Sequence, residues 1–180
     1  MTDISVIILE LIENSLESGA GNIRVHIAEN ESSDEAVTVT ASVVVIDDGR
    51  GMTEEEIGRA MRGGYSTKTT ETEGASTGRG IAKCRALAES ICGSLVIKSG
   101  KDGAGTTVTL TLPMTENVML GDIASTAMTS SCGAAGVRIV LSHETPRGGY
   151  ELAFDTGASA EEALYVEKYV RERELDIRRK

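Results

Sequence analysis

Glu10 and Asn14 lie four positions apart in the segment ELIENSLESGA, which places a carboxylate and an amide on one face of a helix. Such a pair can activate a water molecule and hold a divalent cation. Glu13 is out of phase with that face and would be a poor substitute for Glu10. Because this spacing also arises by chance on exposed helices, the pair alone predicts chemistry only weakly.

The segment Asp47-Asp48-Gly49-Arg50-Gly51 directly follows an apolar, valine-rich run. A carboxylate at the end of a strand can accept a hydrogen bond from an exocyclic amine, and the two glycines let the backbone approach a ligand closely. Aspartate and glycine are also common in turns, so a simple turn is an equal alternative.

Two further glycine segments follow. TGRGI (residues 77–81) joins a long segment rich in glycine, serine and threonine, 62–80, to a helix. Backbone N–H groups at such a helix start attract phosphate. GAGTT (residues 103–107) leads into an alternating run, 106–112, where a hairpin turn is the plain alternative.

These segments need a scaffold, and hydrophobic periodicity supplies one. Helices are expected over 3–18, 80–92, 120–131 and 159–174, and a short one is expected after Thr53, where Glu56 completes a capping box. Strands are expected over 23–28, 37–46, 94–98, 106–112, 137–143 and 150–154. This order predicts an α+β fold: a two-layer sandwich with an antiparallel or mixed sheet and helices on one face. We expect two domains, 1–113 and a small α-β-β-α unit, 114–180.

Charge is unevenly distributed. The net charge is −10; residues 1–58 carry −11, whereas 59–85 carry +4, with six basic and two acidic side chains. The total argues against nucleic-acid or membrane partners. The basic segment is either a solvated loop or an anion site. No apolar run is long enough for a membrane span and no signal peptide is expected, so a cytoplasmic location with reduced cysteines (Cys84, Cys92, Cys132) is predicted.

Taken together, the four segments resemble the ATP-binding domain of the GHKL superfamily, which includes gyrase B, a heat-shock chaperone, histidine kinases and the mismatch-repair ATPase MutL. The resemblance covers about residues 3–113, through ELIENSLESGA, DDGRGM, STGRGI and GAGT in that order. A P-loop motif is absent. The whole chain is similar to stand-alone bacterial members with a short α-β-β-α tail.

The resemblance implies a role for each matching residue. Asn14 would be the Mg²⁺ ligand, Asp47 would accept the adenine amino group and Thr106 would assist through water. Gly49, Gly51 and Met52 would lie against the base, and residues 62–80 would form a lid whose Lys68, Thr77, Gly78, Arg79, Gly80 and Ile81 surround the phosphates. The first segment is closer to the MutL version, in which a glutamate at the position of Glu10 is the general base.

Three functions remain open at this point. The first is a Mg²⁺-dependent ATPase whose lid and tail act on an unidentified protein partner. The second is a kinase acting in trans on histidine or serine, since GYSTKT resembles sensor-kinase lids. The third is a non-catalytic ATP/ADP sensor, because Ser76 and Arg79 depart from the GTGLGL of kinases. The chain begins nine residues before Glu10, so a preceding phosphoacceptor helix is not expected. A homodimer is possible.

Overall fold

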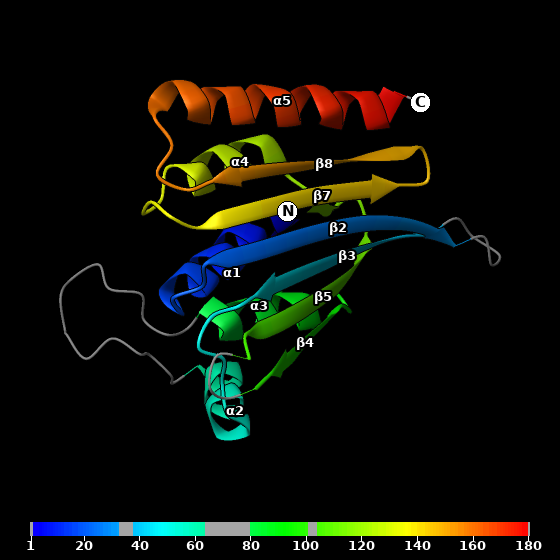
Figure 1. Ribbon diagram of the computed structural model, residues 1–180. Coiled ribbons are helices and arrows are strands. Elements are labelled where there is room, and N and C mark those ends of the chain that lie inside the picture. Colours follow the sequence, from blue (N-terminus) through cyan, green and yellow to red (C-terminus); the bar gives the residue numbers. More distant parts are fainter. Residues whose placement is uncertain (1, 33–37, 64–79, 101–103, 180) are drawn as a thin grey trace.

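The computed structural model describes residues 2–32, 38–63, 80–100 and 104–179, which form a mixed β-sheet with helices against one face (Figure 1). The helices are α1 (Ile4–Glu17), α2 (Glu54–Arg62), α3 (Gly80–Ser90), α4 (Ile123–Ser131) and α5 (Ala160–Arg179). The strands are β1 (Thr2–Asp3), β2 (Asn22–Ser32), β3 (Thr38–Asp47), β4 (Ser94–Ser99), β5 (Thr106–Met114), β6 (Val118–Met119), β7 (Arg138–Thr145) and β8 (Gly148–Asp155). The predicted α+β class is confirmed.

The main sheet has the strand order β4-β5-β3-β2-β7-β8. Every neighbouring pair is antiparallel except β2 and β7, which run parallel. β3 therefore lies centrally and ends at Asp47, opposite Thr106 at the start of β5. This register brings two of the glycine segments to one end of the sheet.

One face of the sheet forms the core, and the strand alternation shows why. Val25, Val43 and Leu110 point to the helix side and are buried. Ile46 and Val96 occupy the alternate positions and are 42% and 49% exposed on the open face. Since side chains alternate along a strand, a single layer of helices is enough to cover the apolar set. Figure 1 shows α1, α3 and α4 behind the sheet.

The C-terminal part of the chain continues this sheet. β7 pairs with β2 from Asn22–Arg138 to Ala28–Glu144, and β8 forms the far edge. α4 packs between α1 and α5. The predicted α-β-β-α elements are present, but they share a sheet and a hydrophobic core with the preceding residues. Whether 1–113 and 114–180 are separate folding units stays a prediction.

Two local features differ from the sequence expectation. The strand expected to end before Pro113 continues through it to Met114, because β4 pairs with β5 only as far as Thr111. Beyond that point β5 has β3 on one side only, where a missing N–H group is tolerated. The short β1–β6 pairing was not predicted, because two-residue strands carry no periodicity.

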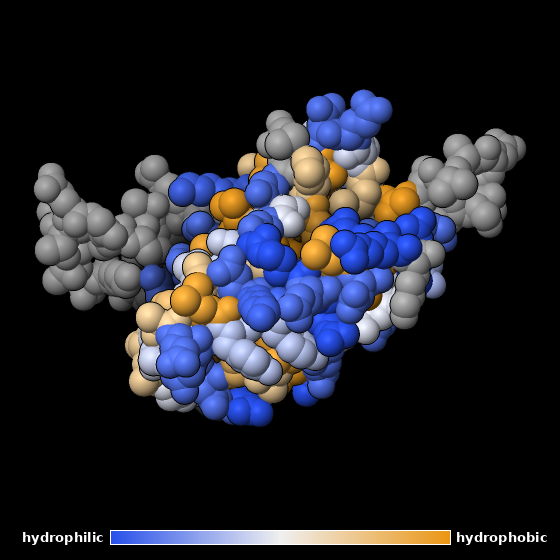
Figure 2. All heavy atoms as spheres, turned by 90° about the horizontal axis from the view of Figure 1, so that it is seen from above, coloured by the Kyte–Doolittle hydropathy of each residue, from blue (hydrophilic) through white to orange (hydrophobic). Residues whose placement is uncertain are grey.

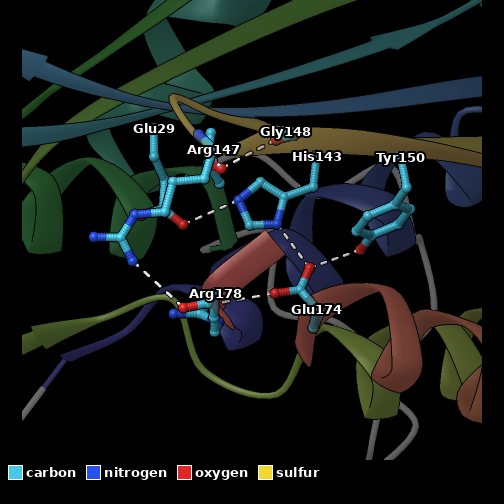
Figure 3. Close-up of polar contacts among 8 residues, drawn as sticks. Glu29, His143, Arg147, Gly148, Tyr150, Glu174 and Arg178 are labelled. Atoms are coloured by element: carbon cyan, nitrogen blue, oxygen red, sulfur yellow. Dashed lines mark hydrogen bonds and ion pairs between the residues drawn. The ribbon is translucent and has the colours of Figure 1, made fainter. Parts of the chain in front are cut away.

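α5 is joined to the sheet by a buried polar cluster (Figure 3). The ring of His143, fully buried on β7, contacts Glu174 of α5 (Nδ1 to Oε1, 2.7 Å) and Glu29 of β2 (Nε2 to Oε1, 3.0 Å). The Tyr150 hydroxyl donates to the same Glu174 oxygen at 2.7 Å. Arg178 contacts the other Glu174 oxygen at 3.4 Å. We call these five residues the His143 cluster.

Candidate functional site

Asp47 is held at the end of β3 by hydrogen bonds to both carboxylate oxygens. The Ser15 hydroxyl, on the buried face of α1, donates to Oδ2 at 2.9 Å. The backbone N–H of Gly49 donates to Oδ1 at 2.9 Å. Each oxygen can still accept a further bond. The carboxylate is thus oriented and half-buried, as the binding of an exocyclic amine requires.

The neighbouring Asp48 binds to the start of β2 instead. Its Oδ1 accepts from the backbone N–H groups of Gly21 and Asn22, both at 2.8 Å, and its Oδ2 accepts from the Asn22 side chain at 2.7 Å. The hydrogen bonds from Asn22 lower the pKa of Asp48 below its usual value. Asp48 therefore secures the start of β2, whereas Asp47 accepts only one hydrogen bond at each oxygen.

A second serine, Ser99 at the end of β4, connects two of the predicted segments, DDGRGM and GAGT. Its hydroxyl lies 3.0 Å from Thr106 Oγ1 and donates to the Gly105 carbonyl at 2.7 Å. The backbone N–H of Met52 donates to Ser99 Oγ at 2.8 Å. These bonds fix Met52 and the buried Thr106 at the same end of the sheet as Asp47. Thr106 lies on β5, directly opposite Asp47 on β3.

The glycines around Asp47 are required by close packing of the chain itself. Gly51 has φ +72°, and a Cβ there would collide with the Gly100 carbonyl. Gly105 has φ +67°, and its Cβ would collide with the Asp47 carbonyl. A Cβ on Gly49 would meet the Ser18 hydroxyl. The sequence analysis expected Gly49 and Gly51 to make room for a base, and this internal packing gives a sufficient separate reason for them.

On another side of α1, Glu10 and Asn14 meet the first residue of α3. A Cβ on Gly80 would collide with Glu10 Oε1 and would lie 3.1 Å from Asn14 Nδ2. The Asn14 amide donates to the Glu10 backbone carbonyl at 2.8 Å, which leaves Asn14 Oδ1 without a donor among the described residues. The expected shared face of Glu10 and Asn14 is therefore present, and it faces the positive end of the α3 dipole.

Cys84 lies one turn into α3, where the charge of the Glu10 carboxylate affects its thiol. Burial and the charge of Glu10 together raise the pKa of the Cys84 thiol to about 12. This thiol is protonated and inert at neutral pH. Ile81, also on α3, packs against the core.

α1 connects the two parts of the site. Its Glu10 and Asn14 face Gly80, and its Ser15, the residue after Asn14, bonds to Asp47. At about 1.5 Å of rise per residue, Glu10 and Ser15 are about 7.5 Å apart along the helix axis. A ligand that contacts both Glu10 and Asp47 must therefore be elongated.

Some predicted residues lie outside the part of the chain that the structure describes. They are Lys68, Thr77, Gly78 and Arg79, together with most of the expected lid, 62–80. The structure brings together Glu10, Asn14 and Gly80 at one end, and Asp47, Gly49, Gly51, Met52 and Thr106 at the other.

Sequence reasoning missed Ser15 and Ser99. Ser15 gives a weak signal, since it is a hydroxyl at a helical position that otherwise carries apolar residues. Ser99 gives none, because its role depends on β4 pairing with β5 so that Ser99 lies opposite Thr106.

Among the described residues, no helix is long and apolar enough to cross a membrane. Likewise, no three His, Cys, Asp or Glu side chains in that part of the chain are grouped as a metal site. Any divalent cation at Asn14 would need further ligands from the substrate and from water.

Comparison with known proteins identifies a family and a fold. A family model described as histidine kinase-, DNA gyrase B- and HSP90-like ATPase matches residues 2–116. Among solved structures, the N-terminal domain of a DNA repair protein is similar with a TM-score of 0.53 and 12% identity, over 93% of this chain and 57% of that one. This chain therefore spans little more than half of that neighbour, and the likeness shows the fold alone. No protein with a curated description matches the sequence.

The family match includes every residue assigned to the two ends of the site, from Glu10 to Thr106, and extends over more than half of the chain. Family membership implies ATP as the ligand. The chain belongs to the family of histidine kinase-, DNA gyrase B- and HSP90-like ATPases.

Proposed function

We propose that this protein is a Mg²⁺-dependent ATPase that binds adenine at Asp47 and hydrolyses ATP at Glu10. The observation that carries the proposal is the convergence of Glu10 and Asn14 on Gly80, at the N-terminus of α3. A helix N-terminus attracts phosphate, and a carboxylate beside it is positioned to act on water rather than to bind the anion.

The Asp47 end supports adenine as the base. Ser15 and the Gly49 N–H hold the carboxylate in one orientation, with lone pairs left to accept from an exocyclic amine. The buried Thr106 hydroxyl, opposite Asp47 in the sheet, would hold a bridging water. Discrimination by a fixed hydrogen-bonding group is strong, because the wrong base leaves that group unpaired.

The donor set at the other end fits a magnesium ion. Asn14 Oδ1 is a hard oxygen ligand, and the amide N–H group beside it is already engaged by the Glu10 carbonyl. When bound, the ion would neutralise phosphate charge. Glu10 has no ion pair with any described residue, and its carboxylate could accept a proton from the attacking water.

We further propose that turnover is slow and serves to regulate an unidentified partner protein. Residues 114–180 carry no catalytic constellation and their α4 packs directly on α1, which bears Glu10 and Asn14. Movement at the nucleotide could therefore reach the C-terminal elements through one helix contact. A cytoplasmic location remains a prediction. Phosphotransfer in trans and ATP/ADP sensing remain the alternative uses of the same site.

The test combines titration calorimetry with phosphate release. Wild-type protein should bind ATP with Mg²⁺, Asp47→Asn should lose binding, and Asp155→Asn, an exposed control on β8, should not. Glu10→Ala should retain binding and lose turnover by roughly 100-fold or more. Glu13→Ala is its matched control, because Glu13 is an exposed glutamate three residues further along α1. This variant should hydrolyse ATP at the wild-type rate.

The outcomes separate the alternatives. No ATP binding by the folded wild type overturns the proposal entirely. Binding without phosphate release, at every nucleotide concentration, leaves a sensor. Transfer of radiolabel to a protein in a lysate, with slow release of free phosphate, supports a kinase instead.

A further inference from the structure

α5 has a buried side and an outward side. Ala163, Val166, Val170 and Ile177 pack inward against the core. The opposite stripe, which we call the outer face of α5, comprises Glu161, Tyr165, Lys168, Glu172, Leu175 and Arg179, all exposed. In Figure 1 α5 is the outermost element at the top of the molecule. Figure 2 looks down on that side and shows a mostly hydrophilic surface with separate hydrophobic residues on it.

The charges beside this stripe are already paired within the chain. Arg171 contacts Asp122 and Glu167, at 3.1 and 2.7 Å, and Arg173 contacts Asp176 at 3.0 Å. Arg178 contacts Glu174.

The four charged residues of the outer face differ from these neighbours. Glu161, Lys168, Glu172 and Arg179 form no ion pair within the described residues. The large side chains between them are also uncovered: Tyr165 is 67% exposed and Leu175 is 47% exposed.

The order of these residues is self-complementary about Val170. Lys168 and Glu172 lie two places before and after it, Tyr165 and Leu175 five places, and Glu161 and Arg179 nine places. In two antiparallel helices related by a twofold axis at that level, each residue meets its mirror position in the other copy. Every mirror pair then joins opposite charges or two large side chains with apolar surface.

We propose that the outer face of α5 is the interface of a symmetric dimer of this chain, with the two α5 helices packed antiparallel about Val170. Each dimer contains Lys168–Glu172, Glu161–Arg179 and Tyr165–Leu175 contacts, each made twice. A parallel arrangement is disfavoured, because it places Lys168 against Lys168 and Glu172 against Glu172. The order of the charges along α5 thus favours a second copy of this chain as the partner, and it favours the antiparallel orientation.

The interface is small, so the dimer is weak. One helix pair buries less surface than a standard stable interface, and the ion pairs remain near solvent. We expect a dissociation constant on the order of 10⁻⁴ M, which rises with salt as the charges are screened.

Analytical ultracentrifugation over a concentration series tests the proposal. Wild type should change from monomer to dimer, and Lys168→Glu, which puts four acidic groups together at the centre, should weaken the dimer roughly tenfold or more. Lys98→Glu, exposed on β4, makes the same change in net charge away from α5 and is the matched control. The double variant Lys168→Glu, Glu172→Lys exchanges the two charges and should restore the dimer.

Restoration by the double variant is decisive when folding is measured beside it, because Lys168 and Glu172 are also i, i+4 neighbours within α5 and exchanging their charges restores that contact too. Circular dichroism confirms that each variant is folded. A wild type that stays monomeric to about 1 mM, tenfold above the expected constant, overturns the proposal. So does a dimer that survives Lys168→Glu, or a folded double variant that fails to associate.

Discussion

At the scale of single residues, two adjacent aspartates show how position decides function. Asp47 and Asp48 have the same type of side chain, but Asp48 accepts three hydrogen bonds from Gly21 and Asn22, whereas Asp47 accepts one at each oxygen, from Ser15 and Gly49. Asp47 therefore keeps more acceptor capacity for a ligand.

The Ser15 hydroxyl should matter to ATP affinity. Ser15→Ala removes the donor to Asp47 Oδ2, so the carboxylate loses its fixed orientation. A hydrogen bond of this kind contributes about 1 kcal/mol, and calorimetry should show ATP affinity reduced roughly fivefold. Ser90→Ala, which loses only a bond to its own helix backbone, is the control. Unchanged affinity in Ser15→Ala would show that Asp47 needs no such support.

Gly80 should control Glu10. In Gly80→Ala the new methyl group occupies the position of Glu10 Oε1, the tip of a flexible side chain that can rotate away. We therefore expect a stability change within about 1 kcal/mol but a loss of turnover close to that of Glu10→Ala. Phosphate release and urea unfolding measure the two effects.

The matched control for Gly80→Ala is Gly58→Ala on α2, where a Cβ makes only ordinary contacts at 3.4 Å with the end of Arg62. Its turnover should be that of wild type. Wild-type turnover in Gly80→Ala would mean that Glu10 does not act from the position it occupies here.

At the scale of elements, the His143 cluster joins α5 and two strands through ionisable groups. Burial draws the pKa of His143 down, but hydrogen bonds and charge from Glu174 and Glu29 outweigh it and raise the pKa above 6.5. The bond to His143 lowers the pKa of Glu29, and the same partner lowers that of Glu174 against the opposing effect of burial.

The cluster should give the protein a bounded pH range of extra stability. A raised histidine pKa stabilises the fold below about 6.5, and this contribution is lost as pH rises through the raised value. Lowered glutamate pKa values stabilise it above about 4.5, and that contribution is lost as pH falls through the lowered values. The free-energy difference between wild type and His143→Gln should thus be largest at about pH 4.5–6.5.

Urea unfolding at pH 5.5 and pH 9 measures this difference. We expect His143→Gln to lose about 3 kcal/mol at the lower pH, because two largely buried carboxylates lose their partner, and less at pH 9. His26→Gln, whose ring bonds to Ser142 instead, should keep the pH profile of wild type. A loss that is equal at both pH values would show that His143 acts through packing alone.

At the scale of the whole molecule, the shared sheet predicts one cooperative unfolding transition. β7 pairs with β2, and α4 packs on α1, so removing residues 114–180 would expose an edge strand and part of the core. Calorimetry and urea unfolding followed by circular dichroism should give coincident transitions.

The truncated chain 1–113 should be unfolded or aggregated in the same measurements. Two separate transitions in the full chain, or a stably folded 1–113, would instead support a domain boundary after Pro113. Either result also bears on how movement at α1 reaches the C-terminal elements.

Local sequence patterns predicted most elements of the fold. Helical periodicity located α1 and α3 to within two residues at each end, and the Thr53–Glu56 capping box is present as predicted, with Glu56 N–H donating to Thr53 Oγ1 at 3.1 Å. These signals are local, since caps and amphipathic faces depend on neighbours within a turn or two. The four segments also indicated the ATPase family, which the family comparison shows.

The long-range relations could be seen only in the folded chain. It distinguished Asp47 from Asp48, added Ser15 and Ser99 to the site, and placed the C-terminal strands beside β2. Each depends on which elements pack or pair and in which register, and residues on separate elements leave no periodic trace of that choice. The His143 cluster is the clearest case, because it unites Glu29, His143 and Glu174 from three elements that no local pattern connects.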